Sequence, residues 1–144
     1  MSISSRFSVG IHILSLLEIN KEGTNSSQFI ANSVNTNPVV IRKIMGMLKK
    51  AGLVTVNPGI AGATPSRSLA EITLFDVYKA VEAVNENELF SIHENPNPDC
   101  LVGKSLQGAI EPIFNMAQLA LEKVLQGITI KDVVDSLKSG NKVC

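Results

Sequence analysis

Four basic side chains occur within one short amphipathic segment, and their spacing suits contact with a polyanion. Residues 38–50 carry Arg42, Lys43, Lys49 and Lys50 beside a stripe of apolar residues. Arginine is suited to bidentate hydrogen bonding with guanine, and lysine to contact with phosphate. We therefore predict that Arg42 and Lys43 reach base edges of double-stranded DNA; a solvated basic face is the simpler alternative. Lys49 and Lys50 are expected to contact phosphate or to cap the helix.

Cys100 is the other residue with reactive chemistry. It follows a segment rich in Pro and Asn and precedes a long apolar pattern. A thiolate at a helix N-terminus has a lowered pKa and oxidises more readily, so we take Cys100 as a candidate sensor. A small packed side chain is the alternative interpretation. Cys144 and His93 do not complete a ligand set, so we expect neither a metal site nor a cofactor.

Catalytic patterns are missing from the sequence. It contains no phosphate-binding Gly-rich loop, no Cys-x-x-Cys pair, and no Ser, His and Asp arrangement typical of nucleophilic catalysis. His12 falls near the apolar stripe of a predicted helix, where a structural role is expected. We therefore expect that the protein is not an enzyme.

The elements around the basic segment follow the order of a helix-turn-helix. Apolar spacing predicts a first helix over residues 6–20, and Ser26 or Ser27 is a suitable N-cap for a second one. Asn37 is a suitable N-cap for a third helix, in which Pro38 occupies the first turn. Two short helices joined by a tight turn, the second of them basic, are typical of DNA-binding proteins.

The segment after the third helix has the pattern of a β-hairpin, the wing of a winged helix-turn-helix. Residues 53–56 and 63–68 have strand character, and turn-forming residues separate them. Beyond the basic residues, we predict contacts with DNA from the start of the second helix, the start of the third helix and the wing. These residues are Ser26, Ser27, Gln28, Asn37, Val39, Asn57 and Thr64.

The second half of the chain combines a loop with a long helix. Residues 73–76 have capping-box spacing and begin a fourth helix. Residues 86–102 lose all periodicity, which predicts a loop with a short strand near 89–92. The chain is thus expected to divide into a winged helix-turn-helix domain over 1–84, a sensor-like loop over 85–104, and a dimerisation helix with a C-terminal helix over 105–144.

The long helix is predicted over residues 105–126. Its apolar residues recur at intervals of three and four, and Pro112 within it predicts a kink or a break. Gly127 ends the pattern, and a capping box at 129–132 begins a last short helix. The apolar stripe is too extensive for one small core, so we predict a homodimer. A helix that packs only within its own subunit is the alternative.

Length and composition are those of one domain. A chain of 144 residues can bury a core without disulfides. No apolar run approaches the ~20 residues of a membrane span, and a signal-peptide pattern is missing, so a cytoplasmic protein without membrane contact is expected. Net charge is zero, yet residues 1–67 carry seven basic and two acidic residues, against six and eleven in residues 68–144. This asymmetry indicates a half that faces a polyanion, unless it arises by chance.

Several of these motifs together resemble a known family. The motifs are Arg-Phe-x-x-Gly-Ile-His-Ile-Leu at 6–14, Leu-Lys-Lys-Ala-Gly-Leu-Val at 48–54, the Gly-rich wing, and Glu-Ile-Thr-Leu-Phe-Asp-Val at 71–77. They resemble the Rrf2 regulators, the family that includes IscR, NsrR and CymR, in the same order along nearly the whole chain. The resemblance implies a mainly α fold with a small β-hairpin, in which the long C-terminal helix mediates dimerisation.

The sequence departs from this family in two places. Cluster-binding members carry three cysteines between the fourth helix and the dimerisation helix, whereas this segment holds only Cys100. An iron–sulfur cluster usually needs four strong ligands, so only a set of His93, Cys100 and two outside ligands would remain. The wing also lacks the arginine of many members, which leaves Asn57, Thr64 and backbone amides for phosphate.

The leading hypothesis is a sequence-specific transcriptional regulator, a homodimeric repressor that responds to thiol oxidation or a small molecule. A winged-helix module that binds protein is one alternative, suggested by the uncharged wing and zero net charge. A metal- or cluster-binding sensor is another. Salt dependence of DNA binding distinguishes the first two, and metal content tests the third.

Overall fold

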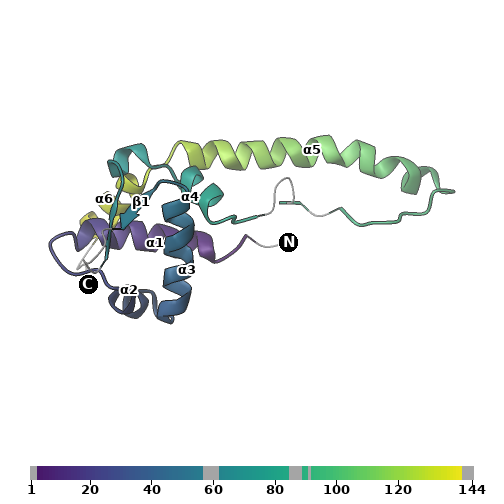
Figure 1. Cartoon of the computed structure of the whole chain (residues 1–144). Coiled ribbons are helices and arrows are strands. Elements are labelled where there is room, and N and C mark those ends of the chain that lie inside the picture. Colours follow the sequence, from purple (N-terminus) through teal and green to yellow (C-terminus); the bar gives the residue numbers. More distant parts are fainter. Residues whose placement is uncertain (1–2, 57–61, 85–88, 91, 141–144) are drawn as a thin grey trace.

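The chain is seen in a computed structural model that describes residues 3–56, 62–84, 89–90 and 92–140. A body of helices and one hairpin carries a long helix that projects from it as an arm (Figure 1). This architecture confirms the predicted mainly α winged helix-turn-helix with a long C-terminal helix. The elements are α1 (Arg6–Ile19), α2 (Ser27–Val34), α3 (Pro38–Lys50), β1 (Val54–Val56), β2 (Ala63–Pro65), the 3-10 turn η1 (Leu69–Glu71), α4 (Leu74–Ala80), α5 (Leu101–Gln126) and α6 (Ile130–Gly140).

The helix-turn-helix begins at the predicted caps. The Ser26 hydroxyl accepts a hydrogen bond from the Phe29 amide at 3.1 Å, and the Asn37 side-chain oxygen accepts one from the Val40 amide at 3.0 Å. Asn35 ends α2 in a left-handed conformation with φ of 66°, which Asn tolerates better than most residues. Because each cap satisfies an otherwise unpaired helix amide, these side chains determine where both helices start.

The base of the hairpin lies against the segment that precedes α2. Strands β1 and β2 are antiparallel, with Thr55 opposite Thr64. Gly62, just before β2, has a φ of 108°, and a Cβ there would lie 2.8 Å from the carbonyl oxygen of Asn25. Only glycine suits both the backbone conformation and this close approach. The base of the wing is therefore held against the segment that leads into α2.

The C-terminal helix α6 packs back onto the winged helix-turn-helix. Ile130 and Val134 are buried in its core, and α6 contacts α1 and η1. Backbone hydrogen bonds also join Leu74 to Ile128 at 2.8 Å and Ile130 to Ile72 at 2.9 Å. The sequence-based division grouped α6 with the long helix; in the structure, the buried side chains of α6 share one hydrophobic core with those of α1, α3 and α4.

The long helix starts earlier than expected. The prediction began it at residue 105, but α5 begins at Leu101, directly after Cys100. Gly103 is therefore inside the first turn. A Cβ at that position would lie 2.4 Å from the Asn97 carbonyl oxygen, so the glycine permits the loop to fold against the helix. The sequence pattern did not reveal this earlier start, because the contact between Gly103 and Asn97 is not local.

Pro112 does not interrupt α5, so of the two predicted outcomes, a kink or a break, the break is wrong. The helix is continuous from Leu101 to Gln126. A proline removes the hydrogen bond to the carbonyl four residues earlier, here that of Gly108. Gly108 is exposed, and no heavy atom lies within 4 Å of the position its Cβ would occupy. Water can therefore reach the free carbonyl, which lowers the cost of keeping the helix intact.

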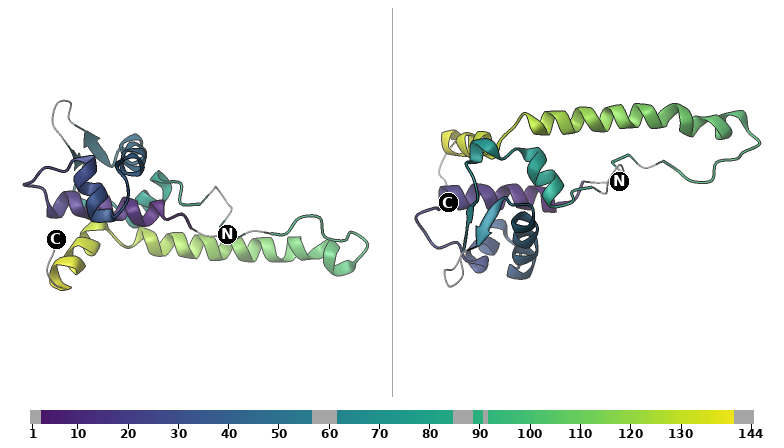
Figure 2. Two further views of the ribbon diagram at one scale, coloured as in Figure 1. Left: turned by 90° about the horizontal axis from the view of Figure 1, so that it is seen from below. Right: turned by 45° about the horizontal axis from the view of Figure 1, so that its top comes forward.

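The short strand predicted near residues 89–92 is also wrong for the described part of that segment. Leu89 is buried, and the ring of Phe90 stacks on that of Phe114 in α5, with 5.1 Å between the centroids. These apolar residues serve to pack the segment against other elements instead of forming a strand. Both views of Figure 2 show the chain before α5 running beside that helix. Among the described helices, none is long and apolar enough to cross a bilayer.

Candidate nucleic-acid interface

Three of the seven basic residues in the first half of the chain are engaged within the protein. Arg6 donates to carbonyl oxygens at the C-terminal end of α4, at 2.9 and 2.8 Å. Lys21 and Arg67 lie 3.5 and 3.3 Å from carboxylate oxygens of Glu18 and Asp76. The other four, all in α3, are exposed and form no ion pair with the described residues: Arg42, Lys43, Lys49 and Lys50.

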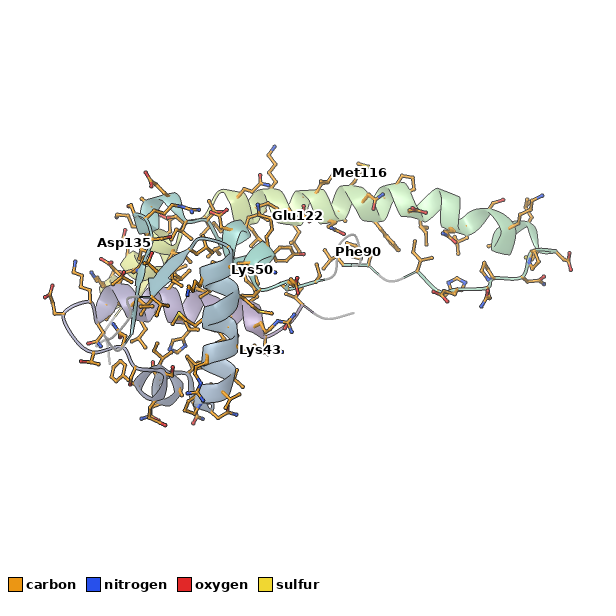
Figure 3. The ribbon with its side chains drawn as sticks, in the orientation of Figure 1. Lys43, Lys50, Phe90, Met116, Glu122 and Asp135 are labelled. Atoms are coloured by element: carbon orange, nitrogen blue, oxygen red, sulfur yellow. The ribbon has the colours of Figure 1, made fainter. Side chains whose placement is uncertain are left out.

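The amphipathic pattern of α3 explains why these side chains face solvent. Ile41, Ile44 and Leu48 are buried on one side of the helix. The N-terminal half of α3 and α2 together form the end of the molecule furthest from α5 (Figure 1). Lys43 lies in the N-terminal half of α3, and Lys50 is the last residue of that helix (Figure 3). Residues 23–70 contain no Asp or Glu, which favours a positive potential around this helix.

The remaining predicted residues of the helix-turn-helix lie close to this end of α3. Ser26 and Ser27 are half-buried and Gln28 is exposed at the start of α2, which packs against α3. Asn37 uses its side-chain oxygen as the cap, so its amide N–H groups remain available as donors. Val39 is 65% exposed, which leaves its methyl groups accessible from solvent.

The wing supplies one described candidate. Thr64 is exposed in β2, whereas Asn57 lies outside the described residues. Phe29, an apolar residue of α2, is 41% exposed. No local signal distinguishes it from Ile30, which is fully buried. The arrangement thus brings α2, α3 and the hairpin together, with basic, amide and hydroxyl groups that can contact phosphates and base edges.

Cys100 lies far from this basic surface, at the N-terminus of α5. Its side chain is exposed, and the backbone amides of Gly103 and Val102 lower the pKa of its thiol by hydrogen bonding to the thiolate. His93 is exposed as well. His12, in contrast, forms a 2.8 Å hydrogen bond with the Ser33 hydroxyl, and burial lowers its pKa, which agrees with a structural role between α1 and α2.

The long helix presents an apolar face that no described residue covers. None of the residues of α5 is buried. Four apolar side chains that recur at helical spacing are 60–69% exposed: Val102, Ile113, Met116 and Val124. An apolar stripe of this kind on a projecting helix is typical of a surface that another protein covers.

Comparison with known proteins agrees with this geometry. The family model of Rrf2, described as an iron-dependent transcriptional regulator, matches residues 3–136. A relative from Bacillus subtilis (strain 168), YwnA, provisionally named an HTH-type transcriptional regulator, is 46% identical over 135 residues, which are 94% of this chain and 98% of YwnA. A crystal structure provisionally assigned to a DNA-binding protein is 42% identical with a TM-score of 0.72, and covers 90% of this chain and 98% of the other.

More distant structures share the fold. The global cysteine regulator CymR of B. subtilis is 21% identical, with a TM-score of 0.65 over 94% of this chain and 98% of its own. The family description names iron, but the donor atoms here do not fit an iron–sulfur cluster. The described residues hold no group of three His, Cys, Asp or Glu side chains placed to bind a metal, and Cys100 is the only cysteine between α4 and α5.

The fold, the helix-turn-helix with its free basic face and the match over nearly the whole chain lead to one assignment. The protein is a member of the Rrf2 family of transcriptional regulators, which are DNA-binding proteins and not enzymes.

Proposed function

We propose that this protein is a homodimeric, sequence-specific repressor that inserts α3 of each subunit into the major groove of DNA. The observation that carries the proposal is the basic face of α3, whose four cations are exposed and make no ion pair with described carboxylates. Surface cations are usually of little value to stability, so this cluster is better explained by an external polyanion. A dimer bound across a promoter would exclude the transcription machinery.

The proposed contacts follow from position along the two helices. Recognition helices read base edges with their N-terminal residues, which here include Arg42 and Lys43. Asn37 would donate to a base edge, and Val39 would contact a thymine methyl group. The phosphate contacts are assigned to the start of α2, the end of α3 and the wing, that is, to Ser26, Ser27, Gln28, Lys49, Lys50, Asn57 and Thr64.

Two copies of α3 need a defined separation, and α5 is the element proposed to set it. Half-sites read by helix-turn-helix dimers lie about 34 Å apart, or one helical turn of DNA. The exposed apolar face of α5 would pack against its equivalent about a two-fold axis, as closed symmetric dimers do. A second copy thus accounts for the apolar side chains that remain exposed in one subunit.

The binding preference should be measured by selecting bound DNA from a random pool, followed by titration of the selected site at several salt concentrations. A palindromic consensus is expected, with affinity falling on the order of 10³-fold between 50 and 200 mM salt. An interaction module for proteins would instead enrich no sequence and show a shallow salt dependence. The lack of an enriched sequence, or a shallow salt dependence, would contradict the proposal that α3 reads DNA.

The signal is proposed to act through Cys100. The thiolate sulfur attacks the O–O bond of a peroxide, which yields sulfenic acid and releases hydroxide. The added polar oxygen lies where the loop before α5 meets that helix at Gly103. A shift there would alter the angle between the DNA-binding domain and the dimer helix. A few kcal/mol of difference between two such arrangements is enough to change their populations usefully.

The Cys100 thiol is expected to react with iodoacetamide at lower pH in the folded protein than after unfolding in urea. The amides of Gly103 and Val102 lower its pKa only in the folded state, so more thiolate is present near neutral pH. A Cys144→Ser background leaves Cys100 as the only thiol. Cys100→Ser protein should bind DNA normally and ignore peroxide and diamide. Equal pH midpoints in both states, or equal oxidant responses of both proteins, would contradict the sensor role.

A further inference from the structure

A cavity of about 970 Å³ lies between α4, α5 and the segment that connects them. Its walls include four aromatic rings, those of Phe75, Tyr78, Phe90 and Phe114. The rings of Phe75 and Tyr78 stack with 6.0 Å between their centroids. A space of this size with aromatic walls is typical of a site for a small molecule.

One polar group in the wall of this cavity, covered by neighbouring atoms, has no partner among the described residues. The Tyr78 hydroxyl is buried and forms no hydrogen bond with any residue that the structure describes. Burial raises the pKa of Tyr78, and the nearby Glu122 carboxylate adds to this shift. Buried hydroxyl groups are nearly always hydrogen-bonded, because an unsatisfied one costs about 1–3 kcal/mol. A ligand whose acceptor atom displaces the side chains that cover the Tyr78 hydroxyl would satisfy it.

The charge around the cavity is negative. Its lining includes the carboxylates of Glu82, Glu111 and Glu122 against the single ammonium group of Lys79. That ammonium lies 4.7 Å from the centroid of the Phe75 ring, at the edge where α4 meets solvent. Glu122, on the side of α5 toward α4 (Figure 3), is held through one oxygen by the Gln118 amide at 3.0 Å. Its other oxygen has no hydrogen-bond partner among the described residues and could face a cation.

The cavity and the exposed apolar stripe occupy opposite faces of α5. Successive residues of an α-helix are about 100° apart. Glu111, Phe114 and Glu122 line the cavity, and the exposed Ile113, Met116 and Val124 follow each of them by two positions. The two sets are thus about 200° apart around the helix. A second subunit on the apolar stripe would leave the cavity open to another occupant.

We propose that this cavity binds a small organic cation with an aromatic or apolar body. The body lies against the rings of Phe90 and Phe114, where cation–π attraction adds to apolar contact. The positive nitrogen faces Glu122, and an acceptor atom of the ligand takes the Tyr78 hydroxyl hydrogen. The ligand touches both α4 and α5, so it would set the angle between them. This regulatory effect rests on the proposed function, whereas binding itself does not.

Two xanthene dyes of opposite charge test the binding directly. Rhodamine 6G is a cation with an ester carbonyl, and fluorescein is an anion of similar shape. Fluorescence anisotropy with the full chain and no DNA should give rhodamine 6G at least about tenfold higher affinity. Glu122→Gln should weaken rhodamine 6G about tenfold, as expected for loss of a close charge pair. Tyr78→Phe should weaken it about threefold, the loss of one hydrogen bond.

Glu71→Gln is the matched control, because Glu71 is exposed and does not line the cavity. It should leave the affinity for rhodamine 6G unchanged. Circular dichroism should show that each variant melts like the wild type, and Phe90→Ala, at a 40% exposed position, provides a second variant that removes one wall. Equal affinities for the two dyes, or equal effects of Glu122→Gln and Glu71→Gln, would overturn the proposal. Retained DNA binding in that case would leave the proposed function intact.

Discussion

Replacing Ile113 and Ala117 together with glutamate is expected to convert the proposed dimer into a monomer. Both side chains are exposed in the single subunit, and Ile113 is 60% exposed. The fold of the single subunit should therefore be unaffected. Against a second copy of α5, two carboxylates would lose their hydration without a partner, at several kcal/mol each. Size-exclusion chromatography with light scattering should show half the mass. DNA affinity should fall by about 10²-fold or more as the second half-site contact is lost.

The matched control for this change is Gln126→Glu. Gln126 is exposed on the same helix but outside the apolar stripe, so this variant adds a carboxylate without burying it. It should remain a dimer and keep its DNA affinity. A wild-type protein that is monomeric at micromolar concentration would contradict the prediction, and so would a double variant that stays dimeric. In either case the apolar face of α5 would need a different partner.

Arg42→Ala is expected to cost about 1–3 kcal/mol on the selected DNA site and to relax the preference at one base pair. The reason is that the guanidinium of Arg42 is exposed near the N-terminal end of α3 and has no ion pair among the described residues. Stability should change by less than about 0.5 kcal/mol for the same reason. Lys50→Ala should instead weaken all sequences alike and reduce the salt slope by about one. Anisotropy titrations on specific and random DNA separate the two effects.

Arg42→Lys is the informative companion of this variant. It keeps the charge but lacks the planar pair of donors that matches a guanine edge. We expect it to retain most non-specific affinity and to lose discrimination. If Arg42→Ala weakens specific and random DNA equally, Arg42 contacts phosphate and the reading of bases passes to other residues of α3.

The local structure of this protein was predictable from the sequence where few neighbours decide it. The helix starts at Ser26, Asn37, Thr73 and Thr129 follow from side chains that accept a hydrogen bond from an amide three residues away. The apolar spacing of α3 likewise predicted which face is buried. Such interactions involve only the residues of one or two helical turns, so the sequence pattern is enough to predict them.

Features that join distant segments were decided by the tertiary structure. Gly103 looks like a helix boundary until Asn97 folds against it, and Phe90 looks like part of a strand until it meets Phe114. The sequence grouped the four basic residues of α3 in one amphipathic segment but did not show what the other three basic residues of the first half contact. Only packing shows that Arg6 is engaged at the end of α4, whereas those of α3 face solvent.

The cavity between α4 and α5 is the clearest example of a feature that only the tertiary structure reveals. Tyr78 and Glu122 are more than forty positions apart, and neither belongs to a motif. They come together because α6 returns to the core, which brings the C-terminal end of α5 against α4. The sequence by itself determined the helices, their caps and the basic face, because these depend on local hydrogen bonds and periodic burial. The cavity, its charge and its unpaired hydroxyl were decided only by the folded chain, because they depend on side chains that packing brings together from separate elements.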